Sequence, residues 1–196
     1  MGKSGRTKIS WKSGPKRQIQ RGEENFSYNG GVSYLVREYE PADFETLWRI
    51  DQECFVPGIA YSRRELMTYV ARKSSFTLVA QRAGDNGRIV HSVDGLGGFV
   101  TADTGRSRRG HIITIDVVEA ARRSGLGSVL LQAAEERMRE AGCVEVGLET
   151  AVDNVGALAF YKRHGYFLVR TVRQYYANGV DAFVLKKDLR SLATDG

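Results

Sequence analysis

The chain has 196 residues, of which 42% are hydrophobic, and this length and composition are typical of one globular domain with a sizeable core. No apolar run approaches the ~20 residues that a membrane-spanning helix needs, and the first 30 residues lack the apolar centre of a secretory signal, so we expect a cytoplasmic protein without a membrane partner. The two cysteines, Cys54 and Cys143, lie far apart without metal-ligand spacing, which fits a reducing compartment and predicts no metal site.

The formal net charge of +6 is concentrated at the start of the chain. The first 32 residues carry seven basic side chains and only two acidic ones. They are rich in glycine and serine and show little apolar periodicity, so we expect residues 1–32 to form a disordered basic tail and residues 33–190 to form the folded domain. A solvated extension is the simplest interpretation of the tail, and weak contact with RNA or the ribosome is the alternative.

The sequence of the first half of the folded domain predicts one strand, two helices and a hairpin. Apolar spacing and turn residues give a strand over 33–37, a helix from 41 to about 54, a second helix to about 73, and strands over 76–81 and 96–100. Ser62 followed by Glu65 predicts a capping box at the start of the second helix. The polar stretch over 83–87 has turn chemistry, with an irregular piece over 91–94.

The second half predicts a strand, a long helix, a strand, a helix and a closing hairpin. These elements cover residues 112–118, 126–141, 144–150, 154–164, 167–176 and 181–185, and Asn178-Gly179 supplies the turn of the hairpin. Gly142 and Gly165 are placed to end the two helices. The order of elements predicts an α/β fold, with a mixed, mostly antiparallel sheet flanked by helices.

A glycine-containing loop lies between the strand over 112–118 and the long helix, in the run Arg-Arg-Ser-Gly-Leu-Gly-Ser-Val-Leu-Leu over 122–131. A helix start offers unpaired N–H groups and the positive end of the helix dipole, so the loop predicts a phosphate site. A dinucleotide-binding loop would need a third glycine where Leu130 stands. A P-loop would need Gly-Lys-Ser/Thr in place of Gly127-Ser128-Val129. Neither of these phosphate loops fits.

What does fit is the pattern Arg-x-x-Gly-x-Gly from Arg122 to Gly127. Together with the preceding Ile-Asp-Val-Val and with Asn-x-x-x-Leu-x-Phe-Tyr-x-x-x-Gly-Tyr from Asn154 to Tyr166, it makes the chain resemble the GNAT superfamily of acyl-CoA-dependent N-acyltransferases over residues 34–187. Within that superfamily the pattern is most similar to RimI-like protein N-terminal (alanine) acetyltransferases. The loop over 55–62 departs from the short Phe-Pro-Trp-Ser of RimI itself.

The resemblance implies a GNAT-like fold, acetyl-CoA as co-substrate and a set of residues that bind it. Backbone groups of one strand would pair with the pantetheine arm of the co-substrate, and Asn154 would form a hydrogen bond with the same arm. Backbone groups of the loop and of the helix start would bind the pyrophosphate, and the side chain of Arg122 would support that binding. In chain order the implied backbone sets are Ile115, Asp116 and Val117 for the arm, and Arg123, Ser124, Gly125, Leu126, Gly127 and Ser128 for the pyrophosphate.

The reaction implied is direct attack of an amine on the thioester, with one base and one acid. Glu149, at the end of its strand, is the implied base, and Tyr161 on the following helix is the implied acid that protonates the leaving thiolate. His111 and His164 also have base chemistry. We rank them lower, because His164 falls at a helix end, where a cation complements the dipole, and His111 begins a strand.

The acceptor that the resemblance favours is a protein N-terminal amine. A small-amine acetyltransferase, for a polyamine or an aminoglycoside, ranks second because residues 55–69 hold no acidic cluster. A non-catalytic CoA-binding or RNA-associated module ranks third. Tyr61, Glu65 and Tyr69 are candidates for the acceptor site, although at helical spacing Tyr69 is more often a core residue.

Overall fold

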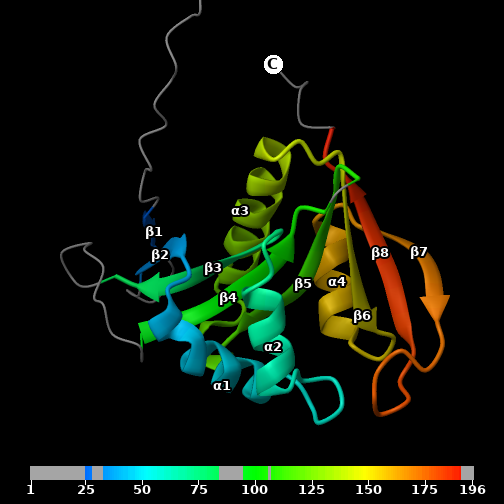
Figure 1. The fold of residues 1–196 in the computed structure, drawn as a ribbon, viewed down its shortest axis with the longest axis horizontal. Coiled ribbons are helices and arrows are strands. Elements are labelled where there is room, and N and C mark those ends of the chain that lie inside the picture. Colours follow the sequence, from blue (N-terminus) through cyan, green and yellow to red (C-terminus); the bar gives the residue numbers. More distant parts are fainter. Residues whose placement is uncertain (1–24, 28–32, 84–94, 106, 191–196) are drawn as a thin grey trace, which may run out of the picture.

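The computed structural model describes residues 25–27, 33–83, 95–105 and 107–190. Eight strands form one sheet in the order β1-β2-β3-β4-β5-β6-β8-β7 (Figure 1). The strands are β1 (Asn25–Ser27), β2 (Ser33–Glu38), β3 (Ser75–Arg82), β4 (Leu96–Asp103), β5 (Arg109–Val117), β6 (Glu145–Ala151), β7 (Phe167–Val172) and β8 (Ala182–Asp188). The helices are α1 (Phe44–Cys54), α2 (Arg63–Val70), α3 (Leu126–Glu140) and α4 (Val155–Arg163), with short 3-10 turns η1 (Pro41–Asp43) and η3 (Glu119–Ala121).

Helices cover both faces of this sheet, α1 and α2 on one side and α3 and α4 on the other (Figure 1). The side chains that α3 buries recur at helical spacing and pack on the strands together with Tyr161 of α4: Leu126, Leu130, Leu131, Ala134 and Met138. On the opposite face a second cluster joins Leu47 and Ile50 of α1 and Leu66 of α2 to Phe99 of β4. Two apolar layers therefore enclose the sheet.

The sheet is antiparallel except where β5 meets β6. These two strands pair in parallel only over Arg109–His111 and Glu145–Gly147, and Figure 1 shows them close together at one end and diverging from there. Residues 112–117 of β5 and 148–151 of β6 therefore do not pair with each other, whereas β6 pairs with β8 along its whole length. We call this unpaired region the β5–β6 opening, and the candidate site lies there.

The predicted order of elements from residue 33 onward is confirmed, and so are the local signals at helix ends. Ser62 and Glu65 form the predicted capping box of α2. Gly142 and Gly165 take φ values of +82° and +84° just beyond α3 and α4, a backbone conformation that glycine adopts without a steric penalty.

Four strand boundaries differ from the prediction by three residues or more: β4 and β8 each end three residues later than predicted, and the start of β5 and the end of β7 also differ. β5 begins at Arg109 rather than at Ile112, because its first residues complete the short parallel ladder with β6. β7 ends at Val172, four residues before the predicted end at Tyr176. The chain leaves the strand near Gln174, which has a φ of +49° and whose amide donates to Asp181 Oδ1 over 2.8 Å. The predicted strand end is therefore a loop.

The predicted boundary at residue 33 falls between two paired strands. Asn25 lies opposite Leu35 in β2, so the end of the basic segment adds a strand to the sheet. Residues 1–24, the predicted turn beyond Ala83 and the irregular piece over 91–94 lie outside the described residues. The predicted contact of the basic segment with RNA or the ribosome stays a prediction. Within the described part of the chain, no helix is long and apolar enough to cross a membrane.

Candidate functional site

The loop between β5 and α3 presents backbone amides at the start of the helix. Gly125, with a φ of +93°, is the N-cap of α3, and its carbonyl oxygen accepts from the amides of Ser128 and Val129 over 2.9 and 3.2 Å. Arg123 also has a positive φ, of 59°. For the amide nitrogens of Arg123, Gly125 and Gly127 there is no hydrogen-bond acceptor among the described residues. These free donors at a helix N-terminus suit the oxygens of a phosphate group.

Other groups of this loop are already engaged. Ser124 Oγ donates to the carbonyl oxygen of Ala121 over 2.7 Å and accepts from the amide of Leu126 over 3.4 Å. Arg122 Nε donates to Val117 O over 3.0 Å, and Arg122 Nη2 approaches Cys54 Sγ at 3.5 Å. The guanidinium therefore connects the loop to β5 and α1, and its predicted support of a phosphate stays a prediction.

The edge of β5 that faces the opening carries unpaired backbone groups. The amide of Val118 donates to Gly97 O, so it points toward β4, whereas Val117 O accepts from Arg122 on the other side. Because successive residues of a strand direct their backbone groups to opposite edges, Ile115 and Val117 face the opening. An extended ligand can add to this edge as a further strand would.

The predicted backbone contact of Asp116 with a ligand stays a prediction. The same alternation, counted from the bond of Val118 to Gly97, directs the backbone groups of Asp116 toward β4 rather than the opening. Its side chain is 1% exposed and interacts electrostatically with Asp51 of α1. The side chain of Asp116 therefore contributes to the α1 face of the sheet.

Glu149 lies in the part of β6 that no longer pairs with β5, and His111 of β5 reaches it. His111 Nε2 lies 2.7 Å from Glu149 Oε2, and the two side chains are 45% and 20% exposed. The pair therefore spans the two diverging strands. Its carboxylate remains accessible from the opening.

The surroundings keep Glu149 ionised. Burial is the largest single effect on the pKa of Glu149, and it raises that pKa. The hydrogen bond and charge of His111, the charge of Arg170 and the hydrogen bond of Tyr175 all lower it, and together they outweigh burial, so the pKa lies below its ordinary value. At neutral pH this side chain is a carboxylate that can accept a proton. The sequence places the base role on Glu149 alone, and the structure adds His111 beside it.

Tyr161 presents a protonated hydroxyl on the α4 side of the sheet. The residue is 6% exposed, and its ring packs edge-on against Tyr166 with centroids 5.4 Å apart. Burial, followed by the charges of Asp116 and Tyr176, raises the pKa of Tyr161 far above its ordinary value. The hydroxyl has no hydrogen-bond partner among the residues that the structure describes, so its proton is available for donation.

Asn154 is the N-cap of α4, and the amide of Ala157 donates to its Oδ1 over 3.0 Å. The side-chain oxygen is thus used by the helix, while its NH₂ group has no partner in the described part of the chain. A role for that NH₂ group toward the pantetheine arm stays a prediction. His164, by contrast, takes the helix-end place expected of it, with Nδ1 2.8 Å from Phe160 O.

Three tyrosines from two loops and one from α2 lie on the other side of the opening. Tyr61, in the loop between α1 and α2, packs edge-on against Tyr69 with centroids 5.1 Å apart, and its hydroxyl donates to Ile113 O of β5 over 3.3 Å. Tyr175 and Tyr176, in the loop between β7 and β8, interact with Glu149 and with Tyr61. The two loops also meet directly, because the amide of Ala177 donates to Gly58 O over 3.2 Å. We call these four tyrosines the acceptor wall.

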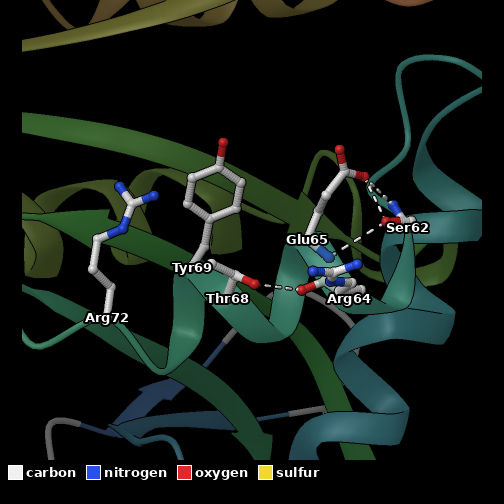
Figure 2. Close-up of a pocket in the computed structure, with 6 residues that line it drawn as sticks. All are labelled: Ser62, Arg64, Glu65, Thr68, Tyr69 and Arg72. Carbon is white, nitrogen blue, oxygen red and sulfur yellow. Dashed lines mark hydrogen bonds between the residues drawn. The ribbon is translucent and has the colours of Figure 1, made fainter.

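A hollow of about 410 Å³ on α2 adjoins this wall through Tyr69. It is lined by Ser62, Arg64, Glu65, Thr68, Tyr69 and Arg72. Figure 2 shows the side chains of Glu65 and Tyr69 pointing to the same side of the helix. The carboxylate of Glu65 accepts from Ser62 at the helix cap, and the guanidinium of Arg72 lies 4.7 Å from the centre of the Tyr69 ring. Tyr69 is partly exposed here rather than a core residue.

The sequence did not single out Tyr175, Tyr176 or Arg170, and it ranked His111 low. His111 and Glu149 stand 38 positions apart in the chain. Only the short parallel ladder of β5 and β6 brings them together. No local pattern signals such a pair, although the place of His111 at the start of the strand before the glycine loop is visible in the sequence.

Curated proteins that are similar to this chain are named N-alpha-acetyltransferases. The chain is 34% identical over 125 residues to the N-alpha-acetyltransferase 30 of Schizosaccharomyces pombe, an alignment that covers 63% of this chain and 78% of the relative. It is 41% identical over 83 residues to an N-alpha-acetyltransferase of Sulfurisphaera tokodaii, covering 42% of this chain and 50% of the relative. The chain thus spans only half the length of that second protein.

Solved structures share the fold. Ard1 from Thermoplasma volcanium superposes with a TM-score of 0.66 at 26% identity, over 78% of this chain and 95% of that one. The ribosomal-protein-S18-alanine N-acetyltransferase of Escherichia coli superposes with a TM-score of 0.65 at 19% identity, over 83% and 97%. At 19% identity, the similarity to this alanine N-acetyltransferase is a similarity of fold alone.

The model of the acetyltransferase (GNAT) family matches residues 44–166, which run from the start of α1 to the end of the α4 segment. The match includes the glycine loop, the β5–β6 opening, Glu149 and Tyr161. The chain therefore belongs to the GNAT acetyltransferase family.

Proposed function

We propose that this protein is an acetyl-CoA-dependent N-acetyltransferase that acts on the α-amine of a protein N-terminus. The observation that carries the proposal is the carboxylate of Glu149, which is paired with His111 at 2.7 Å beside the β5–β6 opening, together with the protonated hydroxyl of Tyr161 on α4. The printed names of the relatives, N-alpha-acetyltransferases, support the choice of acceptor.

Two features of the chain fit acetyl-CoA. The free amides of Arg123, Gly125 and Gly127 offer donors to the pyrophosphate at the start of α3. Ile115 and Val117, which pair with no strand on the side of the opening, offer a strand edge to the amide groups of the pantetheine arm, although Val117 O already accepts from Arg122.

The transfer needs one proton removed and one supplied. The amine nitrogen forms a bond to the acetyl carbonyl carbon, and its proton passes to the Glu149 carboxylate, either directly or through one water. The carbon–sulfur bond then breaks, and the sulfur receives the proton of the Tyr161 hydroxyl. An α-ammonium group with a pKa of about 8 needs only this modest help to become a neutral nucleophile.

The side chains around the acceptor wall favour a peptide over a polyamine. A polyamine site needs free carboxylates, but Glu149 is paired with His111 and Glu65 serves the cap of α2. Asp51 and Asp116 are buried, and Asp153 near Tyr176 is a single exposed acid rather than a cluster. Tyrosine rings with polar tips suit a short peptide better. The RimI-like sequence pattern makes an N-terminal alanine the first acceptor residue to test.

Acetyl transfer to a panel of amines tests the proposal. The purified full chain is mixed with acetyl-CoA and with peptides that begin with different residues, the same peptides blocked at the N-terminus, and a polyamine. We expect an acetyl group on the first residue of at least one free peptide and none on blocked peptides. Acetylation of the polyamine alone would support the small-amine alternative and contradict the proposal.

A further inference from the structure

Asp51, in the last turns of α1, holds the backbone of Tyr61 in place. Asp51 is fully buried, and its Oδ2 accepts from the amide of Tyr61 and from Gln52 Nε2, both over 2.9 Å. Gln52 Nε2 also donates to the carbonyl oxygen of Tyr61 over 2.8 Å. Both backbone groups of Tyr61 are therefore bound by two neighbouring side chains of α1.

Tyr61 in turn joins the acceptor wall to β5. Its hydroxyl donates to Ile113 O, and its ring packs on Tyr69 of α2. The rest of the loop has contacts elsewhere, with Gly58 O accepting from Ala177 in the loop between β7 and β8. The position of the Tyr61 ring relative to the opening thus depends on the two hydrogen bonds at its backbone.

The second oxygen of Asp51 has no partner. Oδ1 of Asp51 and Oδ2 of Asp116 are both fully buried without a hydrogen bond in the described part of the chain, and the two carboxyl groups interact across the contact between α1 and β5. Thr114 Oγ1 donates to the other oxygen of Asp116 over 2.9 Å. Two such buried groups do not both carry a negative charge, because neighbouring like charges in a dry site repel strongly.

Burial is the largest influence on the pKa of both carboxyl groups. Burial raises the pKa of Asp51 to about 6, although the hydrogen bonds from Tyr61 and Gln52 lower it and Glu65 of α2 raises it. Burial and then Asp51 raise the pKa of Asp116 much more, against the lowering effects of Thr114 and Arg122. Burial thus favours the neutral form of both carboxyl groups, while Asp51 Oδ2 accepts the hydrogen bond of the Tyr61 amide.

We propose that Asp51 is a positioning residue for the acceptor: it fixes Tyr61, and through Tyr61 the acceptor wall, against β5. The proposal rests on the proposed function, since it assigns the acceptor to this wall. Asp51 touches neither the acceptor nor the donor, and it acts through the backbone of Tyr61.

Replacement of Asp51 by alanine and by asparagine tests the proposal. Asp51→Ala removes the acceptor of the Tyr61 amide, so we expect the KM for the peptide to rise about tenfold, as loss of a buried hydrogen-bond partner implies, with kcat and the Kd for acetyl-CoA within about twofold of wild type. Asp51→Asn keeps an oxygen for Tyr61 and offers an NH₂ group to Asp116 Oδ2, so it should restore the wild-type KM.

A buried acid at the other end of α1 is the matched control. Asp43 is 3% exposed and is held by Arg37 at 2.7 Å. Asp43→Asn should lower stability and leave the KM for the peptide unchanged. If Asp51→Ala does not fold, Gln52→Ala serves in its place, because Gln52 is exposed and holds the carbonyl oxygen of Tyr61. We expect it to raise the peptide KM about threefold, a smaller effect because it removes a neutral hydrogen bond.

Hydrogen exchange at the Tyr61 amide provides a readout that needs no substrate. Asp51→Ala should speed exchange at this amide about tenfold or more relative to the core strands, since an unpaired amide loses its protection, and Asp51→Asn should not. Wild-type exchange and wild-type peptide KM in folded Asp51→Ala would overturn the proposal. If the wild-type protein acetylates no peptide, the proposed function fails, and the exchange rates alone still show whether Asp51 holds the loop.

Discussion

In the proposed reaction Glu149 accepts a proton and Tyr161 donates one, and the two side chains lie in different environments. Glu149 lies among His111, Arg170 and Tyr175, and its pKa is lowered, so it is ionised when an acceptor arrives. Tyr161 is buried, and its raised pKa keeps its proton until a thiolate forms nearby. The two side chains therefore differ in protonation at neutral pH, as a base and an acid must.

Replacement of Glu149 by glutamine should lower kcat by about 10²- to 10⁴-fold, the usual contribution of a general base, with little change in the Kd for acetyl-CoA. Because the pKa of Glu149 lies below its ordinary value, the rise in rate between pH 6 and about 8 should follow the acceptor amine. Steady-state kinetics and calorimetric titration check both values. Glu145→Gln is the control, because Glu145 lies on the same strand but pairs with Lys186. Equal turnover of Glu149→Gln and wild type would remove the base role.

Tyr161 and Tyr166 allow a paired test of the acid. Tyr161→Phe keeps the ring that packs on Tyr166 and removes the proton, so kcat should fall about 10²-fold or more without loss of stability. Tyr166→Phe removes a buried hydrogen bond to Glu135 Oε1, so it should cost about 1–2 kcal/mol of stability and leave kcat unchanged. Turnover and urea unfolding measure the two effects. An unchanged kcat in Tyr161→Phe would mean that another group supplies the proton.

At the scale of elements, the backbone of the loop before α3 provides the donor site. Gly125 caps the helix at a φ of +93°, a conformation that costs other residues about 1–2 kcal/mol. Any side chain here either strains the loop or changes the direction of the free amides. The contribution of this loop is thus one of backbone shape more than of side-chain charge.

Gly125→Ala should weaken acetyl-CoA binding about tenfold or more, because the strained loop no longer presents its amides to one phosphate. Gly142→Ala is the matched control. Gly142 has a similar φ of +82°, and a Cβ there meets nothing within 4 Å, so this variant should lose a similar amount of stability and bind acetyl-CoA normally. Fluorescence or calorimetric titration gives both constants. Equal affinity in the two variants would show that the loop does not bind the donor.

The elements themselves were largely predictable, and the pairs that form the site were not. The capping box at Ser62, the glycine loop and the cap at Asn154 follow from residues a few positions apart, so local chemistry determines them. The divergence of β5 and β6, the meeting of His111 with Glu149 and the bonds from Asp51 to Tyr61 join separate elements. They follow from how the helices and strands pack, which no window of the sequence contains.

At the scale of the whole molecule, Glu135 of α3 connects three parts of the fold. It is 2% exposed and binds Lys187 of β8 over 2.6 Å, Arg139 over 3.3 Å and the hydroxyl of Tyr166 over 3.0 Å. Every oxygen of this carboxylate is thus satisfied. Through Tyr166, whose ring packs on Tyr161, the network also supports the proposed acid.

Glu135→Ala should lower the free energy of unfolding by about 3 kcal/mol, because it removes the carboxylate that pairs with Lys187 and the buried acceptor of the Tyr166 hydroxyl. The adjacent Glu136 is the control. It is 63% exposed and pairs with the same Arg139 at 2.8 Å, so Glu136→Ala should cost less than about 1 kcal/mol. Urea unfolding measures both. A cost for Glu135→Ala as small as that for Glu136→Ala would contradict this assignment.

The measurement that tests the central claim most directly is mass spectrometry of one alanine-initiated peptide after incubation with acetyl-CoA and either wild type, Glu149→Gln or Glu145→Gln. The account predicts one acetyl group on the N-terminal residue with wild type and Glu145→Gln, and almost none with Glu149→Gln. Equal acetylation by all three proteins, or acetylation only at a lysine side chain within the peptide, would contradict it.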